Sequence, residues 1–229
     1  MWKRIRIAIV VGLITTALLI GSQLKAQEIP TRVAPQPQCV KVLVEDRDGR
    51  SGGTGSLIGP RLVVTCNHVV KDMKKGNKRV EILFPDWQLI DATLVKVDSK
   101  ADLALIVLDK APLGITPLYM VPLRPGQPLA VQGYGYGPYK QSWGVLNGSG
   151  WGKYWRMVEG ATARSGDSGG PVLDEAGDFV GTLWGSAAND GTYFTPSAYI
   201  IKFAKDWLPQ PDNVNPDPGY IFSDSLRKQ

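Results

Sequence analysis

The sequence predicts an all-β protein that ends in one helix. Short apolar runs recur along the chain, and glycine, proline or asparagine turn signals separate them. The pattern of the first half repeats in the second, and prolines at positions 112, 117, 122 and 125 mark the crossing between them. Near the C-terminus, residues 199–208 space their apolar side chains as a helix does. Many short strands followed by a single helix are typical of an all-β fold.

The first 26 residues differ in character from the rest of the 229-residue chain. A basic start precedes an apolar run of 14 residues, Ile7–Ile20, and the small residue Ala26 follows. This pattern predicts a secretory signal over residues 1–26, cleaved to give a secreted or periplasmic protein. The run is short for a membrane span, which needs about 20 residues. An uncleaved membrane anchor is the alternative, because Leu24 departs from the usual A-x-A pattern.

The leader also carries most of the excess positive charge. It holds four of the 26 basic residues and no acidic one, so the remaining chain has 22 basic and 21 acidic residues. A balance so close to neutral gives no reason to expect binding to nucleic acid. Three prolines and little periodicity predict a linker over residues 27–38, and residues 209–229 predict an extended tail.

The first half of the domain, about residues 39–115, reads as strands between turns. The first strand begins at Cys39, and residues 45–50 form a charged turn. The glycine-rich stretch 51–58 lacks the Gly-Lys-Ser/Thr ending that a phosphate-binding loop needs, so it predicts no nucleotide site. A continuous apolar run, typical of a strand buried on both faces, closes this half. The strands expected after the glycine-rich stretch are 62–65, 80–84, 88–98 and 103–108.

The second half, about residues 116–198, repeats this organisation. Asn147-Gly148 is the strongest short hairpin signal in the chain, and we expect strands on both sides of it. The helix over residues 199–208 follows and completes a domain of residues 39–208. The strands expected in this half are 128–132, 141–146, 151–158, 179–184 and 192–195.

Three short motifs interrupt the strand pattern, in the order His, Asp, Ser. The chain's single His, His68, lies in TCNHVV, Asp102 lies in ADLALI, and Ser168 lies in GDSGGP. A Ser hydroxyl is a weak nucleophile unless a neighbouring base takes its proton. A glycine-flanked turn can also aim successive backbone N–H groups at one point, where they would stabilise an oxyanion.

Together these motifs resemble those of the trypsin/chymotrypsin-like serine peptidases, and TCNHVV is closer to the T-x-N-H-V-V form of bacterial HtrA-type members. The resemblance covers residues 41–204 and implies two six-stranded antiparallel β-barrels with the active site between them. It implies a serine endopeptidase in which Ser168 is the nucleophile, His68 the general base and Asp102 the acid that orients His68. The N–H groups of Gly166 and Ser168 would form the oxyanion hole. A catalytically silent trypsin-fold binding module is the alternative.

Two departures from the family pattern concern the acidic residues. In many members a Ser in a V-S-W-G block donates to the catalytic Asp, but the matching stretch here carries Leu183, which cannot donate. In members activated by cleavage, the Asp before the nucleophile pairs with a freed N-terminus, and no Ile-Val-Gly-Gly-like start is present. We therefore expect that a cation such as Arg164 holds Asp167, or that the oxyanion loop forms without a pair. Members that need no activating cleavage are the nearer comparison, although no PDZ-like segment follows the domain.

The resemblance also implies which residues bind substrate: Thr162, Trp184, Gly185 and Gly191. Thr162 lies six residues before the nucleophile, at the base of the pocket for the residue before the cleaved bond. An Asp that would receive Lys or Arg is absent there, and the chain lacks the second His on which glutamate-selective relatives rely. Gly185 and Gly191 match wall positions that stay small in open pockets. An apolar or mixed preference is therefore expected.

The two cysteines, Cys39 and Cys66, leave their pairing open. An exported chain could form one disulfide, and buried free thiols are the alternative. The family's usual disulfide does not carry over, because Val69 rather than Cys follows His68. No group of Cys, His or carboxylate residues has metal-ligand spacing, so we expect no metal or other cofactor. The expected partners are protein or peptide substrates, with no nucleic acid, and a membrane only if the leader is uncleaved.

Overall fold

The computed structural model describes residues 36–46, 49–73, 78–147, 153–187 and 191–208. The predicted signal peptide, most of the predicted linker and the predicted tail lie outside these residues. Within the described part, no helix is long and apolar enough to span a membrane.

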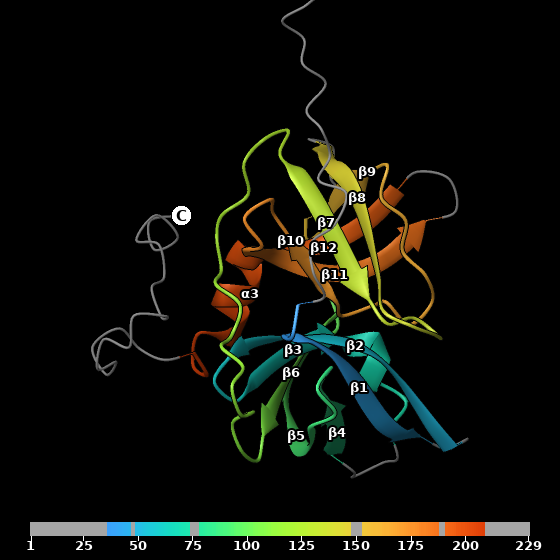
Figure 1. The fold of residues 1–229 in the computed structure, drawn as a ribbon, viewed down its shortest axis with the longest axis vertical. Coiled ribbons are helices and arrows are strands. Elements are labelled where there is room, and N and C mark those ends of the chain that lie inside the picture. Colours follow the sequence, from blue (N-terminus) through green and yellow to red (C-terminus); the bar gives the residue numbers. More distant parts are fainter. Residues whose placement is uncertain (1–35, 47–48, 74–77, 148–152, 188–190, 209–229) are drawn as a thin grey trace, which may run out of the picture. The chain divides into compact units, whose positions relative to one another are not determined.

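The described residues form two closed antiparallel barrels of six strands each, as predicted (Figure 1). The strand order is β1-β2-β3-β6-β5-β4 in the first barrel and β10-β11-β12-β9-β8-β7 in the second. The first comprises β1 (Cys39–Asp46), β2 (Gly49–Gly59), β3 (Leu62–Cys66), β4 (Arg79–Leu83), β5 (Leu89–Asp98) and β6 (Leu103–Leu108). The second comprises β7 (Pro128–Gly133), β8 (Lys140–Asn147), β9 (Arg156–Glu159), β10 (Pro171–Leu173), β11 (Phe179–Ala187) and β12 (Gly191–Pro196). Within the described residues, two helices accompany the barrels, α2 (Asn67–Val70) and α3 (Ser197–Ala204).

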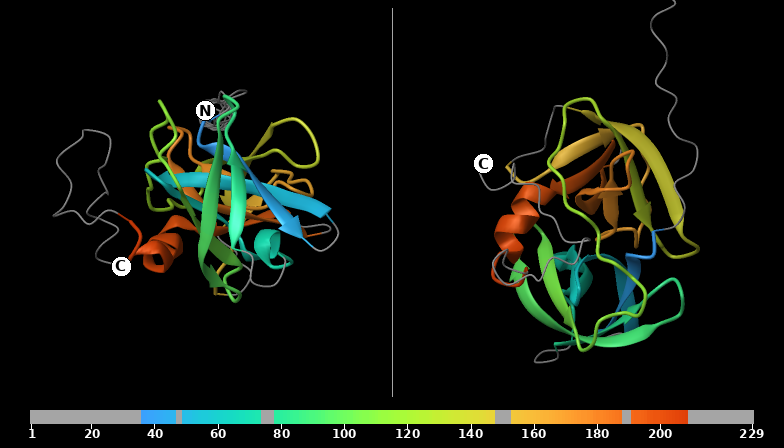
Figure 2. Two further views of the ribbon diagram at one scale, coloured as in Figure 1. Left: turned by 90° about the horizontal axis from the view of Figure 1, so that it is seen from below. Right: turned by 60° about the vertical axis from the view of Figure 1, so that its left-hand side comes forward.

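Three apolar clusters hold the fold together. One fills the first barrel around Val42, Ile82 and Ile106, and another fills the second around Leu129 and Phe194. The third cluster joins the barrels and α3, which lies alongside both of them (Figure 2). Burial of apolar area stabilises by about 25 cal/mol per Å², so this shared cluster fixes the two halves against each other. Its fully buried members include Val64, Leu103, Leu105, Leu173, Phe179 and Ile200.

The structure differs from four local predictions. The charged turn expected over residues 45–50 is shorter, because Glu45 pairs with Arg50 and Asp46 pairs with Gly49 in the ladder of β1 and β2. The expected tight hairpin at Asn147-Gly148 is wrong, because Asn147 pairs with Met157 and a long connection separates the two strands. The ring of Tyr154 packs on Tyr199 and that of Trp155 on Trp184, so these two residues belong to the connection and not to a strand. The helix α3 begins two residues earlier than expected and ends four earlier. The short strand β10 was not expected, because three residues carry too little periodicity.

Candidate active site

The paired strands β3 and β6 bring His68 and Asp102 together. Cys66, the last residue of β3, pairs with Leu103, the first of β6, so the residues flanking these ends meet. His68 lies in α2, directly after β3, and Asp102 directly precedes β6. The backbone N–H of His68 donates to Asp102 Oδ1 at 2.8 Å, and His68 Nδ1 lies 2.5 Å from Asp102 Oδ2. Both carboxylate oxygens therefore hold the same histidine.

The backbone of Asp102 adopts a left-handed conformation, with φ at +55°. Such a conformation is uncommon outside glycine and costs of order 1 kcal/mol, so it persists only where neighbouring contacts impose it. Here the Asp102 carbonyl also accepts the N–H of Asn67 at 3.1 Å. The Asp102 carboxylate therefore meets the backbone N–H and the ring of His68, although Leu183 supplies no donor to it.

Ser168 lies in the turn between β9 and β10, which we call the nucleophile turn (residues 166–170). Gly166 and Gly169 have φ of +87° and +91°, values that favour glycine. A Cβ on Gly169 would lie 2.0 Å from the Thr54 carbonyl oxygen, and one on Gly166 would lie 2.8 Å from the Gly135 backbone. The glycines of GDSGGP are thus required by close backbone contacts with the first barrel and with the loop after β7.

The first barrel supplies hydrogen bonds to the nucleophile turn that the sequence did not reveal. The Thr54 backbone N–H donates to the Ser168 carbonyl at 2.9 Å, and Thr54 Oγ1 donates to the Gly166 carbonyl at 2.8 Å. Ser56 Oγ donates to the Gly169 carbonyl at 3.1 Å. The sequence offered one signal for these donors. In the stretch 51–58, small hydroxyl residues alternate with glycine at positions where a buried strand usually carries apolar side chains.

The Ser168 hydroxyl donates to the Trp184 carbonyl at 2.9 Å. The backbone N–H groups of Gly166 and Ser168 have no acceptor within the described residues, so both are available to a ligand oxygen. His68 is more accessible than its partner, with 38% of its side chain exposed against 13% for Asp102. The open face of the imidazole and the hydroxyl can therefore both reach a bound substrate.

The expected cation for Asp167 is Arg164. Arg164 Nη2 lies 3.0 Å from Asp167 Oδ1, and Arg164 Nε lies 3.2 Å from Oδ2. The Arg164 backbone N–H donates to the same Oδ2 at 2.7 Å. Asp167 is only 4% exposed, so it needs this pairing to offset its desolvation. A bidentate guanidinium is well suited to a buried carboxylate.

The four residues predicted to bind substrate lie in different surroundings. Trp184 packs between Trp155 and Tyr193, and a Cβ on Gly185 would meet no other atom within 4 Å. Thr162 is exposed, and its backbone N–H donates to Ser142 Oγ at 2.9 Å. A Cβ on Gly191 would lie 3.1 Å from the Met157 side chain. Met157 is thus a neighbour of the predicted pocket wall that sequence patterns did not indicate.

Both cysteines are buried free thiols in the structure. Cys66 Sγ donates to the Leu183 carbonyl at 3.1 Å and lies within 4.8 Å of the ligand atoms of His68 and Asp102. Burial, and after it the negative charge of Asp102, raises the pKa of the Cys66 thiol. His68 Nδ1 already bonds to Asp102 Oδ2, and Cys66 Sγ already bonds to the Leu183 carbonyl. Each of the three side chains therefore has a protein partner in this structure.

Residues 53–181 match the family of the trypsin-like peptidase domain. The chain belongs to this family. It is 27% identical over 191 residues to the serine protease Rv3671c of Mycobacterium tuberculosis, and the alignment covers 76% of this chain and 45% of that relative. It is 31% identical over 141 residues to the uncharacterized protein y4bJ of Sinorhizobium fredii, and that alignment covers 58% of this chain and 22% of the relative. The chain therefore spans less than half the length of these curated relatives.

Solved structures of trypsin-like peptidases share the fold. The active form of Rv3671c superposes with a TM-score of 0.63 at 23% identity, over 77% of this chain and 83% of that one. A serine endoprotease from Yersinia pestis gives 0.64 at 19% identity, over 74% and 62%. A variant of the HtrA-type protease AlgW gives 0.64 at 18% identity, over 74% and 60%. The HtrA-type likeness inferred from TCNHVV thus has a structural counterpart.

Proposed function

We propose that this trypsin-like peptidase family member is a serine endopeptidase that cleaves protein or peptide substrates through an acyl-enzyme. Ser168 is the nucleophile, His68 the general base and Asp102 the residue that holds the imidazole. The observation that carries the proposal is the fixed orientation of His68. Its Nδ1 and its backbone N–H both bond to Asp102, which leaves Nε2 to take the proton from Ser168.

The chemistry begins when the Ser168 hydroxyl turns from the Trp184 carbonyl to His68 Nε2. Hydrogen bonds between nucleophile and base often tighten only when substrate binds, so the resting contact is compatible with this step. As Oγ attacks the substrate carbonyl carbon, its proton moves to Nε2. The developing oxyanion is met by the N–H groups of Gly166 and Ser168.

Collapse of the tetrahedral intermediate expels the leaving amine, which receives the proton from His68. Water then attacks the acyl-enzyme with His68 again acting as base, and Ser168 regains its proton when the acid product leaves. The Arg164–Asp167 pair supports this cycle from outside the reacting atoms. It fixes the residue between the two proposed oxyanion donors, so Arg164 is a positioning residue.

The acyl side of the substrate is proposed to lie against Trp184, Gly185 and Gly191, with Thr162 near its base. Gly185 leaves open space where a side chain would stand, and Met157 narrows the wall at Gly191. The absence of a charged group among these four residues supports an apolar or mixed preference at the residue before the cleaved bond.

Labelling with a fluorophosphonate probe tests the proposal directly. The protein is expected to react covalently at Ser168, and tryptic mass mapping should place the adduct in the peptide that contains GDSGGP. Ser168→Ala should not label, and His68→Ala should label far more slowly. Wild-type protein that stays unlabelled while folded would support the silent binding module instead.

We also propose that the protein is exported and cleaved after Ala26. Mass spectrometry of the secreted or periplasmic form should then find an N-terminus near Gln27. Intact Met1 in a membrane fraction would favour the anchor and contradict cleavage.

A further inference from the structure

Two hollows adjoin each other beside the nucleophile turn. The larger, about 530 Å³, runs between the start of β2 and the loop after β7, and we call it the Lys41 groove. The smaller, about 250 Å³, is lined mainly by apolar and aromatic side chains, and we call it the Trp87 pocket. Lys41 and Tyr134 line both, so the two hollows form one continuous surface. Leu83, Phe84, Pro85 and Tyr139 complete the pocket around Trp87.

One end of the Lys41 groove lies beside the backbone of the nucleophile turn. Gly53 lines it, and a Cβ on Gly53 would lie 3.1 Å from the Ser168 carbonyl and 2.8 Å from the Val69 side chain. Val69 directly follows His68, so this end of the groove lies near α2, which carries His68. Of the predicted acyl-side residues, Trp184 and Gly185 lie instead on β11 and Gly191 on β12, and Thr162 lies between β9 and β10. The groove is therefore placed to receive the part of a substrate that follows the cleaved bond.

A row of side chains leads across the first barrel from the nucleophile turn to the pocket. Thr54 pairs with Lys41 and Lys41 pairs with Leu83, so these residues of β2, β1 and β4 share one face of the sheet. The alternate residues Val42 and Ile82 point into the barrel core. Two strand spacings of about 4.8 Å make roughly 10 Å, which an extended peptide covers in about three residues.

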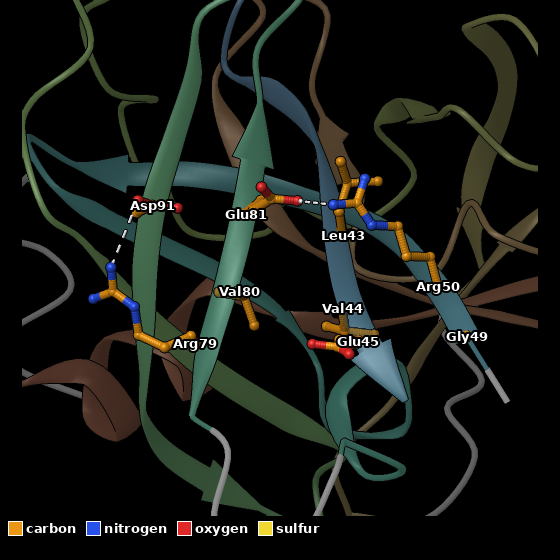
Figure 3. A pocket seen from close by; sticks show the side chains of 9 residues that line it. All are labelled: Leu43, Val44, Glu45, Gly49, Arg50, Arg79, Val80, Glu81 and Asp91. Atoms are coloured by element: carbon orange, nitrogen blue, oxygen red, sulfur yellow. Dashed lines mark ion pairs between the residues drawn. The ribbon is translucent and has the colours of Figure 1, made fainter. Parts of the chain in front are cut away.

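The charge of this surface is positive. Lys41 and Arg50 line the groove, and no acidic residue lines either hollow. Arg50 already pairs with Glu81 at 3.3 Å, across the neighbouring hollow shown in Figure 3. Lys41 has no ion pair within the described residues, and its ammonium lies 5.1 Å from the Tyr134 ring centroid. Lys41 is therefore the cation available to an acidic ligand.

Trp87 holds its aromatic side chain in solvent beside the pocket, with its backbone in an unfavourable conformation. Trp87 is 83% exposed and has φ of +69°, a conformation that a bulky residue rarely adopts. Its N–H donates to the Phe84 carbonyl in the turn between β4 and β5, which holds the ring out beside the pocket. Asp86, the nearest acid in sequence, accepts hydrogen bonds from Gln88 and does not line the pocket. Exposed aromatic residues held in fixed positions are typical anchors for a partner chain.

We propose that the Lys41 groove and the Trp87 pocket bind an extended segment of a protein substrate downstream of the cleaved bond, with an acidic side chain on Lys41 and an aromatic one in the pocket. The 10 Å row places the aromatic residue about three or four positions after the bond. The acidic residue lies two positions before the aromatic one, because alternate side chains of an extended peptide point to the same face. This inference rests on the proposed peptidase function for its direction, but the binding itself does not require turnover.

Fluorescence anisotropy with the full chain carrying Ser168→Ala tests the binding separately from catalysis. The probe is an amidated, fluorescein-labelled peptide of glycine and serine that carries Glu at position two and Phe at position four, so that both side chains point to one face of an extended peptide. Replacing Glu by Gln should weaken binding about threefold, the size of one partly exposed ion pair. Replacing Phe by Ala, or Trp87 by Ala in the protein, should weaken it about tenfold, as loss of an aromatic anchor does.

The decisive comparison is made in Lys41→Gln. The difference between the Glu and Gln peptides should vanish in that variant and persist in Lys100→Gln and Trp207→Ala, whose residues are exposed elsewhere. A Glu preference that survives Lys41→Gln, or no preference in the parent, overturns the assignment. Binding only of peptides with a free C-terminal carboxylate overturns the choice of an internal acidic residue. If the probe binds as expected but Ser168 does not label with fluorophosphonate, the surface stands and the peptidase proposal fails.

Discussion

The two halves of the candidate active site are held in different ways. His68 and Asp102 are 34 residues apart and both belong to the first barrel, where the ends of β3 and β6 fix them. The nucleophile turn instead receives hydrogen bonds from residues 112 and 113 positions away in the chain, Thr54 and Ser56. In the opposite direction, Thr195 Oγ1 donates to the Ala101 carbonyl beside Asp102 at 3.3 Å, and the Leu183 carbonyl accepts Cys66 Sγ at 3.1 Å.

This difference indicates how much each barrel contributes to positioning the residues of the candidate site. The first barrel carries both His68 and Asp102 and holds them through the ends of β3 and β6. It also donates hydrogen bonds to the nucleophile turn. The second barrel holds the nucleophile turn through the Arg164–Asp167 pair and through β11, where the Leu183 carbonyl accepts the Gly169 N–H and the Trp184 carbonyl accepts the Ser168 hydroxyl. Changes in the first barrel are therefore expected to affect both halves, whereas most changes in the second should affect Ser168 alone.

The largest expected effect comes from breaking the base half with Asp102→Asn. Asparagine tolerates the left-handed backbone, so the fold should persist, but the imidazole would take the wrong tautomer. We expect turnover to fall about 10,000-fold. Asp98→Asn is the matched control, because Asp98 bonds to Tyr199 and to backbone N–H groups outside the site. Steady-state assays on a peptide substrate should show a small effect for the control, and an equal loss in both variants would contradict the assignment.

The nucleophile half is tested by Arg164→Ala, which leaves the buried Asp167 without its cation. If the oxyanion donors lose their positions, turnover should fall about 100-fold or more. Arg124→Ala is the control, since Arg124 pairs with the buried Asp174 at 3.4 Å away from the nucleophile turn. Adding Asp167→Asn to Arg164→Ala should recover part of the loss if uncompensated charge is the cause. Unchanged turnover in Arg164→Ala would exclude Arg164 as the positioning residue.

The contribution of one barrel to the other is measured by Thr54→Val. The change removes the donor to the Gly166 carbonyl and the acceptor for the Tyr134 N–H, 3.1 Å away, and both groups are left unpaired. A cost of about 1–3 kcal/mol in that turn should lower turnover about tenfold. Thr195→Val removes one of the reverse contacts and should change turnover much less. The comparison fails if the two valine variants lose activity equally.

The smallest effect is expected when residues are added ahead of Gln27 in a chain cut after the leader. The Arg164–Asp167 pair already meets the carboxylate that an inserted N-terminus meets in cleavage-activated relatives. Turnover at matched folded concentration should therefore be the same with and without the extension. An extended protein that is inert, and regains activity on trimming, would show that Asp167 needs a terminal partner.

The sequence predicted the family and both barrels, because GDSGGP, TCNHVV and ADLALI are short and contiguous. The catalytic roles of His68, Asp102 and Ser168 stay predictions. Arg164 was also foreseeable, since it lies three residues before a buried acid with no other obvious cation. The roles of Thr54 and Ser56 were not foreseeable, because their hydrogen-bond partners are more than 100 residues away and only the closed barrels bring them together. The hairpin at Asn147 failed for the same reason: aromatic packing on Trp184 and Tyr199 outweighed a local turn preference.

The long separation between Thr54 and the nucleophile turn also sets an order of assembly during synthesis. Contacts between distant residues form late, and N-terminal units fold first as the chain leaves the ribosome. The first barrel can thus orient His68 before Ser168 has been made. The nucleophile turn cannot settle until both barrels exist, because its supporting donors and its own backbone come from opposite ends of the domain. A chain released before its second barrel is complete would therefore carry a positioned base but no positioned nucleophile.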